Sequence, residues 1–303
     1  MNYYNEIKEQ LINNEAYKKV KDYSKNRSDL ETYYNVGKLL VEAQGGEARA
    51  KYGDNLIKEY SKKLTQEIGR GYSSRNLRNM RQFYLMFKDG IWQTVSTKLS
   101  WSHIIELAWL EDKEKIRYYL QISDNYNLSV RELRERIKSS EYERLDDNTK
   151  EKLNTKQEPE IIDLTKNPII IRTSHNYERV TEKVLKQLIL EDISNFMKEL
   201  GDGFSFIDDE YKIKLGNKYN YIDLLLFNYK YNCFVVVELK VTELKKEHIG
   251  QIEVYMNYID KNMRTINQDK TIGIIICKKD NKFVMEYCSD NRIYRTTYLL
   301  EKI

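Results

Sequence analysis

The stretch that decides the fold covers residues 219–241 and reads YNYIDLLLFNYKYNCFVVVELKV. It contains two β-type apolar runs, YIDLLLF and CFVVVELKV, and each is interrupted by a carboxylate: Asp223 in the first and Glu238 in the second. Only a tight connection, residues 228–232, separates the runs. Consecutive strands with a short connection usually pair. We therefore expect a hairpin that brings Asp223 and Glu238 to neighbouring positions.

The second run has the pattern of a strand buried on both faces. Val236, Glu238 and Lys240 fall on one face and the intervening Val and Leu residues on the other. Buried charges are costly unless they pair or bind a metal, and two close carboxylates repel unless a cation lies between them. Asp223 and Glu238 therefore predict a Mg²⁺ or Mn²⁺ site. Lys240 beside it would stabilise an attacked phosphate or orient the nucleophilic water. The alternative is a structural ion pair with Asp223 as a turn residue.

The elements on either side predict an α/β sandwich. Helical spacing extends over 176–200 and stops at Gly201, and a second helix is expected over about 246–261. Runs that are apolar on both faces, such as TIGIIIC, are typical of central strands covered by helices. Further strands are expected at 204–207, 211–215, 271–277, near 283–288 and near 294–299.

The helix expected at 246–261 adds a third element to the candidate site. Gln251 and Tyr255 are four residues apart, so they lie on one helical face, and Gly250 would let the helix approach closely. A Gln–Tyr pair suits a phosphate or a metal-bound water. This signal is weak by itself because Gln and Tyr occur at that spacing on many helices.

Residues 1–145 are expected to form an all-α domain. Apolar side chains recur at three- and four-residue spacing, as in 33–40 and 56–64, and glycine-containing turns separate the helices. Ser129 and Glu132 form a capping box that predicts a helix carrying Leu133 and Ile137 inward. The polar residues 146–167 are expected to be a linker or a mobile helix end, followed by the α/β domain at 168–303.

A local basic patch suggests a polyanionic partner. The net charge of the chain is only +4, but residues 51–88 hold nine basic and three acidic residues, a local charge of +6 that begins at Lys51. Within this window Arg75, Arg78 and Arg81 recur at three-residue steps after a serine N-cap, which resembles a recognition helix for nucleic acid. Core-facing positions would be Leu77, Met80, Phe83 and Tyr84. The alternative is a solvated basic face that salt-bridges neighbouring helices.

Composition excludes several other classes of protein. Hydrophobic residues make up 41% and charged residues 32% of the 303-residue chain, which suits a globular protein with two domains. No secretory signal and no transmembrane run is visible, so we expect a cytoplasmic protein without a membrane partner. The three cysteines are expected to be free core thiols. His103 is expected to start or pack a helix, and the three histidines predict no zinc cluster.

Taken together, these motifs resemble the PD-(D/E)XK nuclease superfamily, and in particular the YhcG-type bacterial family, formerly a domain of unknown function. The resemblance rests on Asp223, then Glu238-Leu-Lys240, then Gly250-Gln251-x-x-x-Tyr255. It extends to YYNVGKLL, GYSSRNLRNMRQFY, LSWSHIIEL, FMKELGDGFSFI and GQIEVYMNYID. It implies a restriction-endonuclease-like fold, Mg²⁺-dependent hydrolysis of phosphodiester bonds, and a helical N-terminal domain that contacts DNA or partners.

One position departs from the family pattern. Members usually carry a glutamate in the helix before the sheet, just after a leucine, and here Leu185 is followed by Lys186. Glu182, one turn earlier on roughly the same face, is the candidate substitute as a metal ligand. The departure removes one metal ligand that the resemblance would imply.

Three hypotheses follow from the sequence. The first is a DNA nuclease acting in defence against foreign DNA or in DNA processing, with a homodimer as the expected assembly. The second is a nuclease-like, non-catalytic nucleic-acid-binding subunit of a larger complex, which the departure at Lys186 favours. The third gives the helical half mainly an oligomerising role. The complete set of Asp223, Glu238 and Lys240 favours the first.

Overall fold

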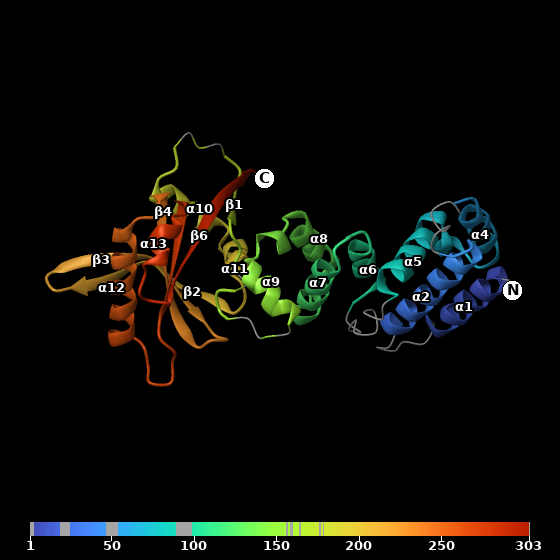
Figure 1. Ribbon diagram of the computed structural model, residues 1–303, viewed down its shortest axis with the longest axis horizontal. Helices are drawn as coiled ribbons and strands as arrows, with labels where there is room; N and C mark the ends of the chain where they lie inside the picture. Colours follow the sequence, from blue (N-terminus) through green and yellow to red (C-terminus); the bar gives the residue numbers. More distant parts are fainter. Residues whose placement is uncertain are drawn as a thin grey trace. The chain divides into compact units, whose positions relative to one another are not determined.

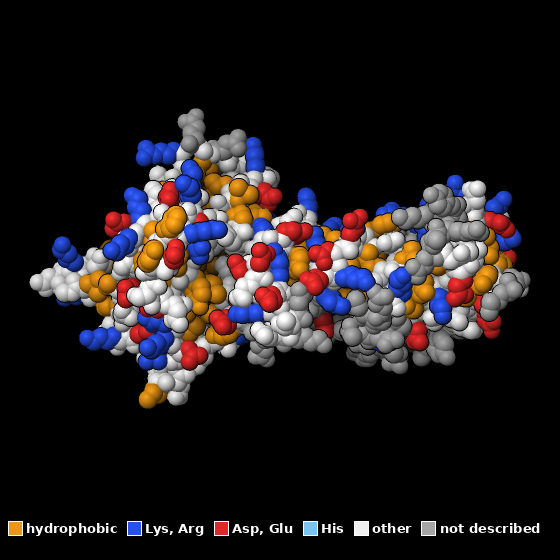
Figure 2. All heavy atoms as spheres, in the orientation of Figure 1, with side chains coloured by type: hydrophobic (Ala, Val, Ile, Leu, Met, Phe, Trp, Pro, Cys, Tyr) orange, Lys and Arg blue, Asp and Glu red, His pale blue; other side chains and the backbone are white. Residues whose placement is uncertain are grey.

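A computed structural model of the chain describes residues 3–18, 25–46, 54–88, 99–155, 157, 160–163, 165–175, 177 and 179–302. Lys51 of the basic window and Asn176, the expected start of a helix, lie outside the described residues. The chain divides into two compact units, Met1–Tyr142 and Glu143–Ile303, and each is considered by itself (Figure 1). Figure 2 shows Lys and Arg side chains interspersed with Asp and Glu over the visible face of each unit.

The described part of unit 1 is helical, as predicted. Its apolar side chains converge between the helices, and Leu11, Leu40, Leu77 and Met80 are completely buried. The helices are α1 (Tyr3–Lys18), α2 (Lys25–Ala43), α4 (Asp54–Glu67), α5 (Ser74–Phe87), α6 (Trp101–Leu107), α7 (Lys113–Asn125) and α8 (Val130–Lys138), with a 3-10 turn, η1, at Arg70–Tyr72.

Local capping explains where two of these helices begin. Ser129 precedes α8, and its hydroxyl oxygen accepts from the N–H of Glu132 at 3.3 Å while the Glu132 carboxylate accepts from the N–H of Ser129 at 2.9 Å. The predicted capping box is therefore confirmed, and Leu133 is completely buried. His103 in α6 is buried, with Nδ1 accepting from the N–H of Ser100 at 3.1 Å and Nε2 2.9 Å from the Leu128 carbonyl oxygen. This confirms its predicted role at the start of a helix.

Unit 2 is built on a six-stranded mixed sheet with the order β1-β6-β5-β4-β3-β2. The β1–β6, β6–β5 and β5–β4 pairs are parallel, and β4–β3 and β3–β2 are antiparallel. The hairpin predicted from residues 219–241 is the β3–β4 pair. The strands are β1 (Ile169–Thr173), β2 (Phe204–Leu215), β3 (Lys218–Asn228), β4 (Cys233–Glu243), β5 (Ile272–Lys279) and β6 (Ile293–Lys302).

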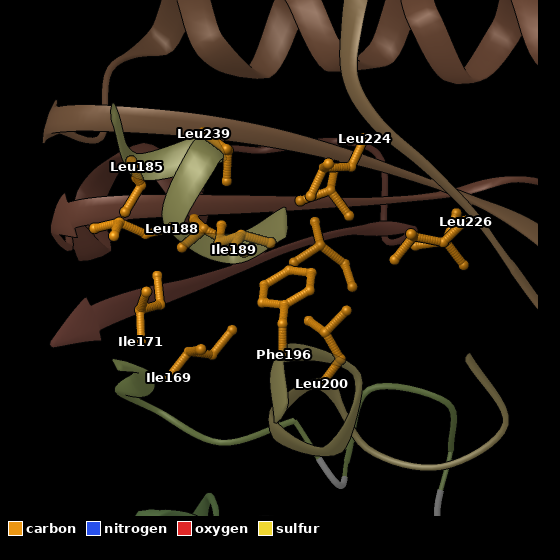
Figure 3. Close-up of a cluster of buried hydrophobic side chains, with 14 of the residues drawn as sticks. Ile169, Ile171, Leu185, Leu188, Ile189, Phe196, Leu200, Leu224, Leu226 and Leu239 are labelled. Carbon is orange, nitrogen blue, oxygen red and sulfur yellow. The ribbon is translucent and has the colours of Figure 1, made fainter. Parts of the chain in front are cut away.

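Helices cover both faces of this sheet. On one face α10 (Glu182–Glu191) and α11 (Ile193–Leu200) bury Leu185, Leu188 and Phe196 against alternate residues of β4 (Figure 3). On the other face α12 (Lys246–Asn262) packs against Val236 of β4. Val235, Val237 and Leu239 belong to the first cluster, so the predicted alternation of β4 is confirmed.

Glycine allows α12 to lie close to β5. A Cβ atom on Gly273 would lie 2.6 Å from Sδ of Met256 and 2.8 Å from Cδ1 of Ile252, so a side chain there would displace α12. The close approach predicted at Gly250 is wrong: a Cβ atom there would have no described atom within 4 Å. Gly250 is exposed because it lies on the outer side of α12.

Several predicted elements differ from the structure. The strand predicted near 283–288 is wrong, because Lys282–Glu286 form a short helix, α13, in which Phe283 is 76% exposed. A short apolar run cannot distinguish the two conformations by its pattern. Strands expected at 204–207 and 211–215 form one strand, β2, with an irregularity between Phe206 and Asp208. The helix expected over 176–200 is divided at Asp192, which caps α11 through the N–H of Asn195 at 3.2 Å. Strand β1 was not predicted.

The segment expected to be a linker, residues 146–167, contains helix α9 (Asp147–Asn154). The Thr149 hydroxyl donates to the Asp163 carbonyl at 2.8 Å, and Nζ of Lys152 lies 2.9 Å from the Asp163 carboxylate. The Thr296 hydroxyl of β6 donates to the Lys166 carbonyl at 2.8 Å. The first two interactions hold the segment together, and the third connects it to the sheet of unit 2.

Candidate active site

The candidate site lies where β3 and β4 separate. Their pairing register runs from Asn228–Cys233 to Leu224–Val237 and ends there. One step further Oδ2 of Asp223 accepts a hydrogen bond from the N–H of Leu239 at 2.9 Å. A carboxylate therefore takes the place of a backbone acceptor at the end of the ladder. Asp223 and Glu238 lie on adjacent strands at this point, as predicted from the sequence.

The backbone of β2 is also irregular at this level. The register of β2 with β3 places Glu210 opposite Asp223, and Glu210 has a φ of +49°. The buried face of β3 changes here too, because Ile222 and Leu225 share one core cluster although they are three residues apart. The alternation of β3 is therefore broken at Asp223, whose carboxylate bonds to the backbone of β4.

Glu238 and Lys240 are buried charges. Their exposed fractions are 1% and 7%, and Nζ of Lys240 lies 3.2 Å from Oε2 of Glu238. The other carboxylate oxygen, Oε1, is buried and has no hydrogen-bond partner among the described residues. A buried acceptor without a donor costs about 1–3 kcal/mol or more when charged. This oxygen is therefore available to a cation.

Burial raises the pKa of both carboxylates. Burial first, and then the neighbouring Asp223 charge, raises the pKa of Glu238 to about 7 from 4.5. Burial also raises the pKa of Asp223, although the hydrogen bond from Leu239 opposes this. For Lys240, burial favours the neutral amine, but the charges of Glu238, Glu182 and Asp223 raise its pKa overall. The ammonium group of Lys240 thus stays charged.

The residues present fit a divalent metal ion. Asp223 and Glu238 supply hard oxygen donors of the kind that Mg²⁺ and Mn²⁺ prefer, and the unpartnered Oε1 of Glu238 is free for coordination. The two carboxylates and Lys240 together carry one net negative charge. Among the described residues no group of three or more His, Cys, Asp or Glu side chains is arranged to hold a metal. Water or substrate oxygens would have to complete the shell.

Helix α12 brings Gln251 and Tyr255 to this site. Nε2 of Gln251 donates to the Tyr255 hydroxyl at 3.1 Å, as their spacing predicts. Burial raises the pKa of Tyr255, and the charges of Glu238, Lys240 and Asp223 also act on it. His248, at the start of the same helix, was considered in the sequence only for zinc. Its pKa is lowered by burial and by the charge of Lys240, so this ring also lies near the site.

Helix α10 contributes Glu182 and Lys186. Glu182 is exposed in the first turn, and its charge acts on both Asp223 and Lys240. Lys186 is buried and forms an ion pair with the exposed Glu210 of β2. The sequence did not indicate Glu210, because the contact joins elements 24 residues apart. Family members usually carry a glutamate at this position of the helix. Here the helix carries Lys186, and the nearby carboxylate comes instead from Glu210 of β2.

The three predicted arginines of α5 differ in exposure. Arg75 is exposed, whereas Arg78 and Arg81 are half-buried, and Nη1 of Arg81 donates to Oε1 of Gln44 at 3.4 Å. Each three-residue step rotates about 60° back around a helix, so Arg81 lies about 120° from Arg75. The N-cap predicted for this helix is Ser73, which accepts from the N–H of Asn76 at 3.3 Å. Leu77, Met80 and Phe83 are completely buried, as predicted.

Two family models match the sequence, one in each half of the chain. Residues 163–300 match the family described as YhcG PDDEXK nuclease domain, and residues 6–144 match the DUF1016 N-terminal domain. The chain therefore resembles the YhcG-type PDDEXK family, with the match to the nuclease-domain model lying within unit 2. The predicted fold class, an α/β restriction-endonuclease-like sandwich with an all-α N-terminal domain, is confirmed. Unit 2 therefore carries a PDDEXK nuclease domain.

The chain is also similar to individual proteins. The Escherichia coli (strain K12) protein named "Putative nuclease YhcG" is 28% identical over 283 residues, which covers 81% of this chain and 76% of that protein. A repair endonuclease from Pyrococcus abyssi and the EndoMS–dsDNA2 complex are solved structures with 18% identity and TM-scores of 0.29 and 0.30. Each match covers 41% of this chain and 48% of the solved chain, so it spans about half of that chain's length. Among the described residues, no helix is long and apolar enough to cross a membrane.

Proposed function

We propose that this protein is a divalent-metal-dependent nuclease that hydrolyses phosphodiester bonds of DNA, in defence against foreign DNA or in DNA processing. The observation that carries the proposal is the buried, unpartnered Oε1 of Glu238 beside Asp223, inside a PDDEXK nuclease domain. Mg²⁺, or Mn²⁺ in its place, is the proposed cofactor. Its ligands would be Asp223 and Glu238, and the charge of Glu182 would act on the site from its rim.

Each side chain has a role that follows from its position. When bound, the metal ion supplies Lewis-acid polarisation of a phosphate oxygen. Asp223, fixed by the N–H of Leu239, and Glu238 orient the donor oxygens. Lys240 keeps its proton and stabilises the negative charge that develops on the attacked phosphate. Gln251, held by Tyr255, offers its amide oxygen to orient the attacking water.

Unit 1 is proposed to contact the DNA outside the active site. Arg75 is exposed and suited to a phosphate, whereas Arg78 and Arg81 are half-buried. Their proposed contribution to DNA binding is therefore largest for Arg75. Replacement of all three by glutamine should lower the slope of log affinity against log salt by up to about 0.9 for each lost phosphate contact on duplex DNA. An unchanged slope would contradict the predicted recognition helix.

A plasmid assay tests the catalytic proposal. Purified wild-type protein, with added Mg²⁺ or Mn²⁺, is expected to cut plasmid, linear duplex or single-stranded DNA. The Asp223→Ala/Lys240→Ala double variant should lose this activity, and chelation of the metal should abolish it in the wild type. The matched control, Asp269→Ala/Lys270→Ala, removes the same charges from exposed positions between α12 and β5. Equal cleavage by the wild type and the double site variant would show the proposal to be wrong.

The ion pair of Lys186 and Glu210 favours a second candidate. A lysine stands at the usual glutamate position, and its partner carboxylate is already engaged. This arrangement suits a nuclease-like subunit that binds nucleic acid without cleaving it. Metal-independent DNA binding without cleavage, by the wild type and by the Asp223→Ala/Lys240→Ala variant alike, would establish this second function. We propose a homodimer in either case, which light scattering of the purified chain tests.

A further inference from the structure

Strands β2 and β3 continue past the sheet as a two-stranded arm, residues 211–222. Residues Tyr211–Leu215 of β2 pair with Lys218–Ile222 of β3, whereas the pairing of β3 with β4 begins only at Leu224. The turn between the strands contains Gly216, with a φ of +60°. In Figure 1 this hairpin projects beyond helix α12.

The two faces of the arm differ in character. One face carries Ile213 and Ile222, both buried with α12 in one core cluster, so the arm is held in place at its base. Directly paired residues share a face. The pairs Lys212–Tyr221 and Lys214–Tyr219 therefore lie together on the opposite face. We call these four residues the arm stripe.

The arm stripe is exposed and positively charged. Tyr219 and Tyr221 are 56% and 52% exposed, and both lysines are exposed. Nζ of Lys212 lies 3.9 Å from the centroid of the Tyr219 ring. The arm as a whole contains three lysines and no Asp or Glu. Exposed aromatic rings on one strand beside lysines on the next suit a partner that offers both phosphates and flat rings.

We propose that the arm stripe binds a nucleic-acid strand next to the active site. This inference rests on the proposed function, because it identifies where the substrate strand lies outside the site. Lys212 and Lys214 would neutralise two phosphates, and Tyr219 and Tyr221 would stack against bases or sugars. The stripe begins close to the site along the chain, since Tyr221 is two residues from Asp223 on the same strand.

The dimensions of the arm match a short stretch of strand. A β-strand advances about 3.4 Å per residue, so Tyr219 lies about 14 Å from Asp223 along β3. A stacked nucleic-acid strand advances about 3.4 Å per nucleotide. The stripe therefore extends over about four nucleotides on one side of the scissile phosphate.

The charge of the stripe has a competing explanation. β2 is an edge strand of the sheet, and lysines on edge strands oppose pairing with a second chain. That role does not require exposed tyrosines on the same face as the lysines. It also predicts a different outcome on substitution, because loss of the lysines would then cause self-association and leave nucleic-acid affinity unchanged.

The test measures binding of labelled oligonucleotides, single-stranded and duplex, to the full-length chain by fluorescence anisotropy in the presence of EDTA. The arm variant is Lys212→Gln/Lys214→Gln, and the control is Lys261→Gln/Lys270→Gln, which removes one exposed lysine from the last turn of α12 and another from the loop before β5. At 0.1 M salt, each phosphate contact on duplex DNA contributes about eightfold to affinity relative to 1 M salt. Loss of two contacts should therefore weaken binding by the arm variant up to about 60-fold at 0.1 M salt. Its salt slope should fall by about 1.8 on duplex or about 1.4 on single strands.

A second variant tests the rings without changing charge. Tyr219→Thr/Tyr221→Thr keeps β-forming residues and should weaken binding at least about fivefold for each ring that stacks, with the salt slope unchanged. If both arm variants bind like the control while the wild type binds and cleaves DNA, the stripe proposal is wrong and the proposed function stands. Self-association of the arm variant at unchanged affinity would also overturn it. A wild type that neither binds nor cleaves overturns the proposed function itself.

Discussion

Replacement of Glu238 by glutamine is expected to remove a pH-dependent destabilisation of unit 2. Burial, and then the charge of Asp223, raises the pKa of Glu238 to about 7 from 4.5. Between pH 4.5 and about 7, the Glu238 carboxyl group is therefore protonated in the native state and ionised in the unfolded state. The stabilising effect of protonation is complete below pH 4.5 and is lost as the pH rises to about 7. A shift of this size corresponds to about 3 kcal/mol of unfolding free energy.

Hydrogen exchange of β4 peptides measures this effect in the metal-free protein. The free energy of opening in the wild type should fall by about 3 kcal/mol between pH 4.5 and 7 relative to the glutamine variant. Loss of the partner of Lys240 lowers the stability of the variant at every pH in this range, so the slope rather than the absolute value is compared. The three Trp residues, at positions 92, 101 and 109, all precede residue 143, where unit 2 begins. Their fluorescence thus gives an internal control that should not change with Glu238→Gln.

Divalent cation supplies the second half of the test. Above about pH 7 the wild type should recover stability when Mg²⁺ or Mn²⁺ is added, because the cation replaces the proton at the buried carboxylate. The glutamine variant should respond much less. Equal pH slopes in the two proteins, together with an equal response to metal, would refute the argument that the unpartnered oxygen of Glu238 is a cation ligand.

Three further predictions concern the surroundings of this carboxylate. Cation affinity, measured by titration calorimetry, should fall about tenfold per pH unit below about pH 7, because Glu238 must release a proton on binding; a flat profile would contradict this. Lys186→Glu should increase the stabilisation of unit 2 by added metal without increasing the rate of DNA cleavage, and a faster variant would contradict it. Gly273→Ala should lower the unfolding free energy of unit 2 by about 1–3 kcal/mol through contacts with Met256 and Ile252, whereas the control Gly250→Ala should be neutral or stabilising.

The sequence was sufficient for features that depend on local pattern. Alternation in β4 places Val236 on the α12 side and Val237 on the α10 side, because neighbouring side chains of a strand must point to opposite faces. The short connection between β3 and β4 makes them neighbours in the sheet, because consecutive strands joined by a few residues usually pair. The i, i+4 spacing of Gln251 and Tyr255 likewise leads directly to the hydrogen bond observed.

Features that depend on contacts between distant segments were not accessible in this way. The partner of Lys186 is Glu210, and no local spacing connects a helix residue with a residue 24 positions later in a bulged strand. Strand β1 pairs in parallel with β6, more than 120 residues away, so its five residues carry no hairpin signal. Arg81 was grouped with Arg75 by sequence spacing alone, and the drift of three-residue steps around a helix separates them.

The charges of the site suggest why a lysine can stand where the family usually has a glutamate. Asp223, Glu238 and Lys240 carry a net charge of −1, and under the proposed function one divalent cation changes this to +1, which attracts a singly charged phosphodiester. The pair of Lys186 and Glu210 adds no net charge. A glutamate at 186 beside Glu210 would add two negative charges, so the site with its cation would carry −1 and repel the phosphate. Lys186 therefore keeps the net charge of the cation-bound site positive, because it neutralises the carboxylate that Glu210 of β2 already contributes.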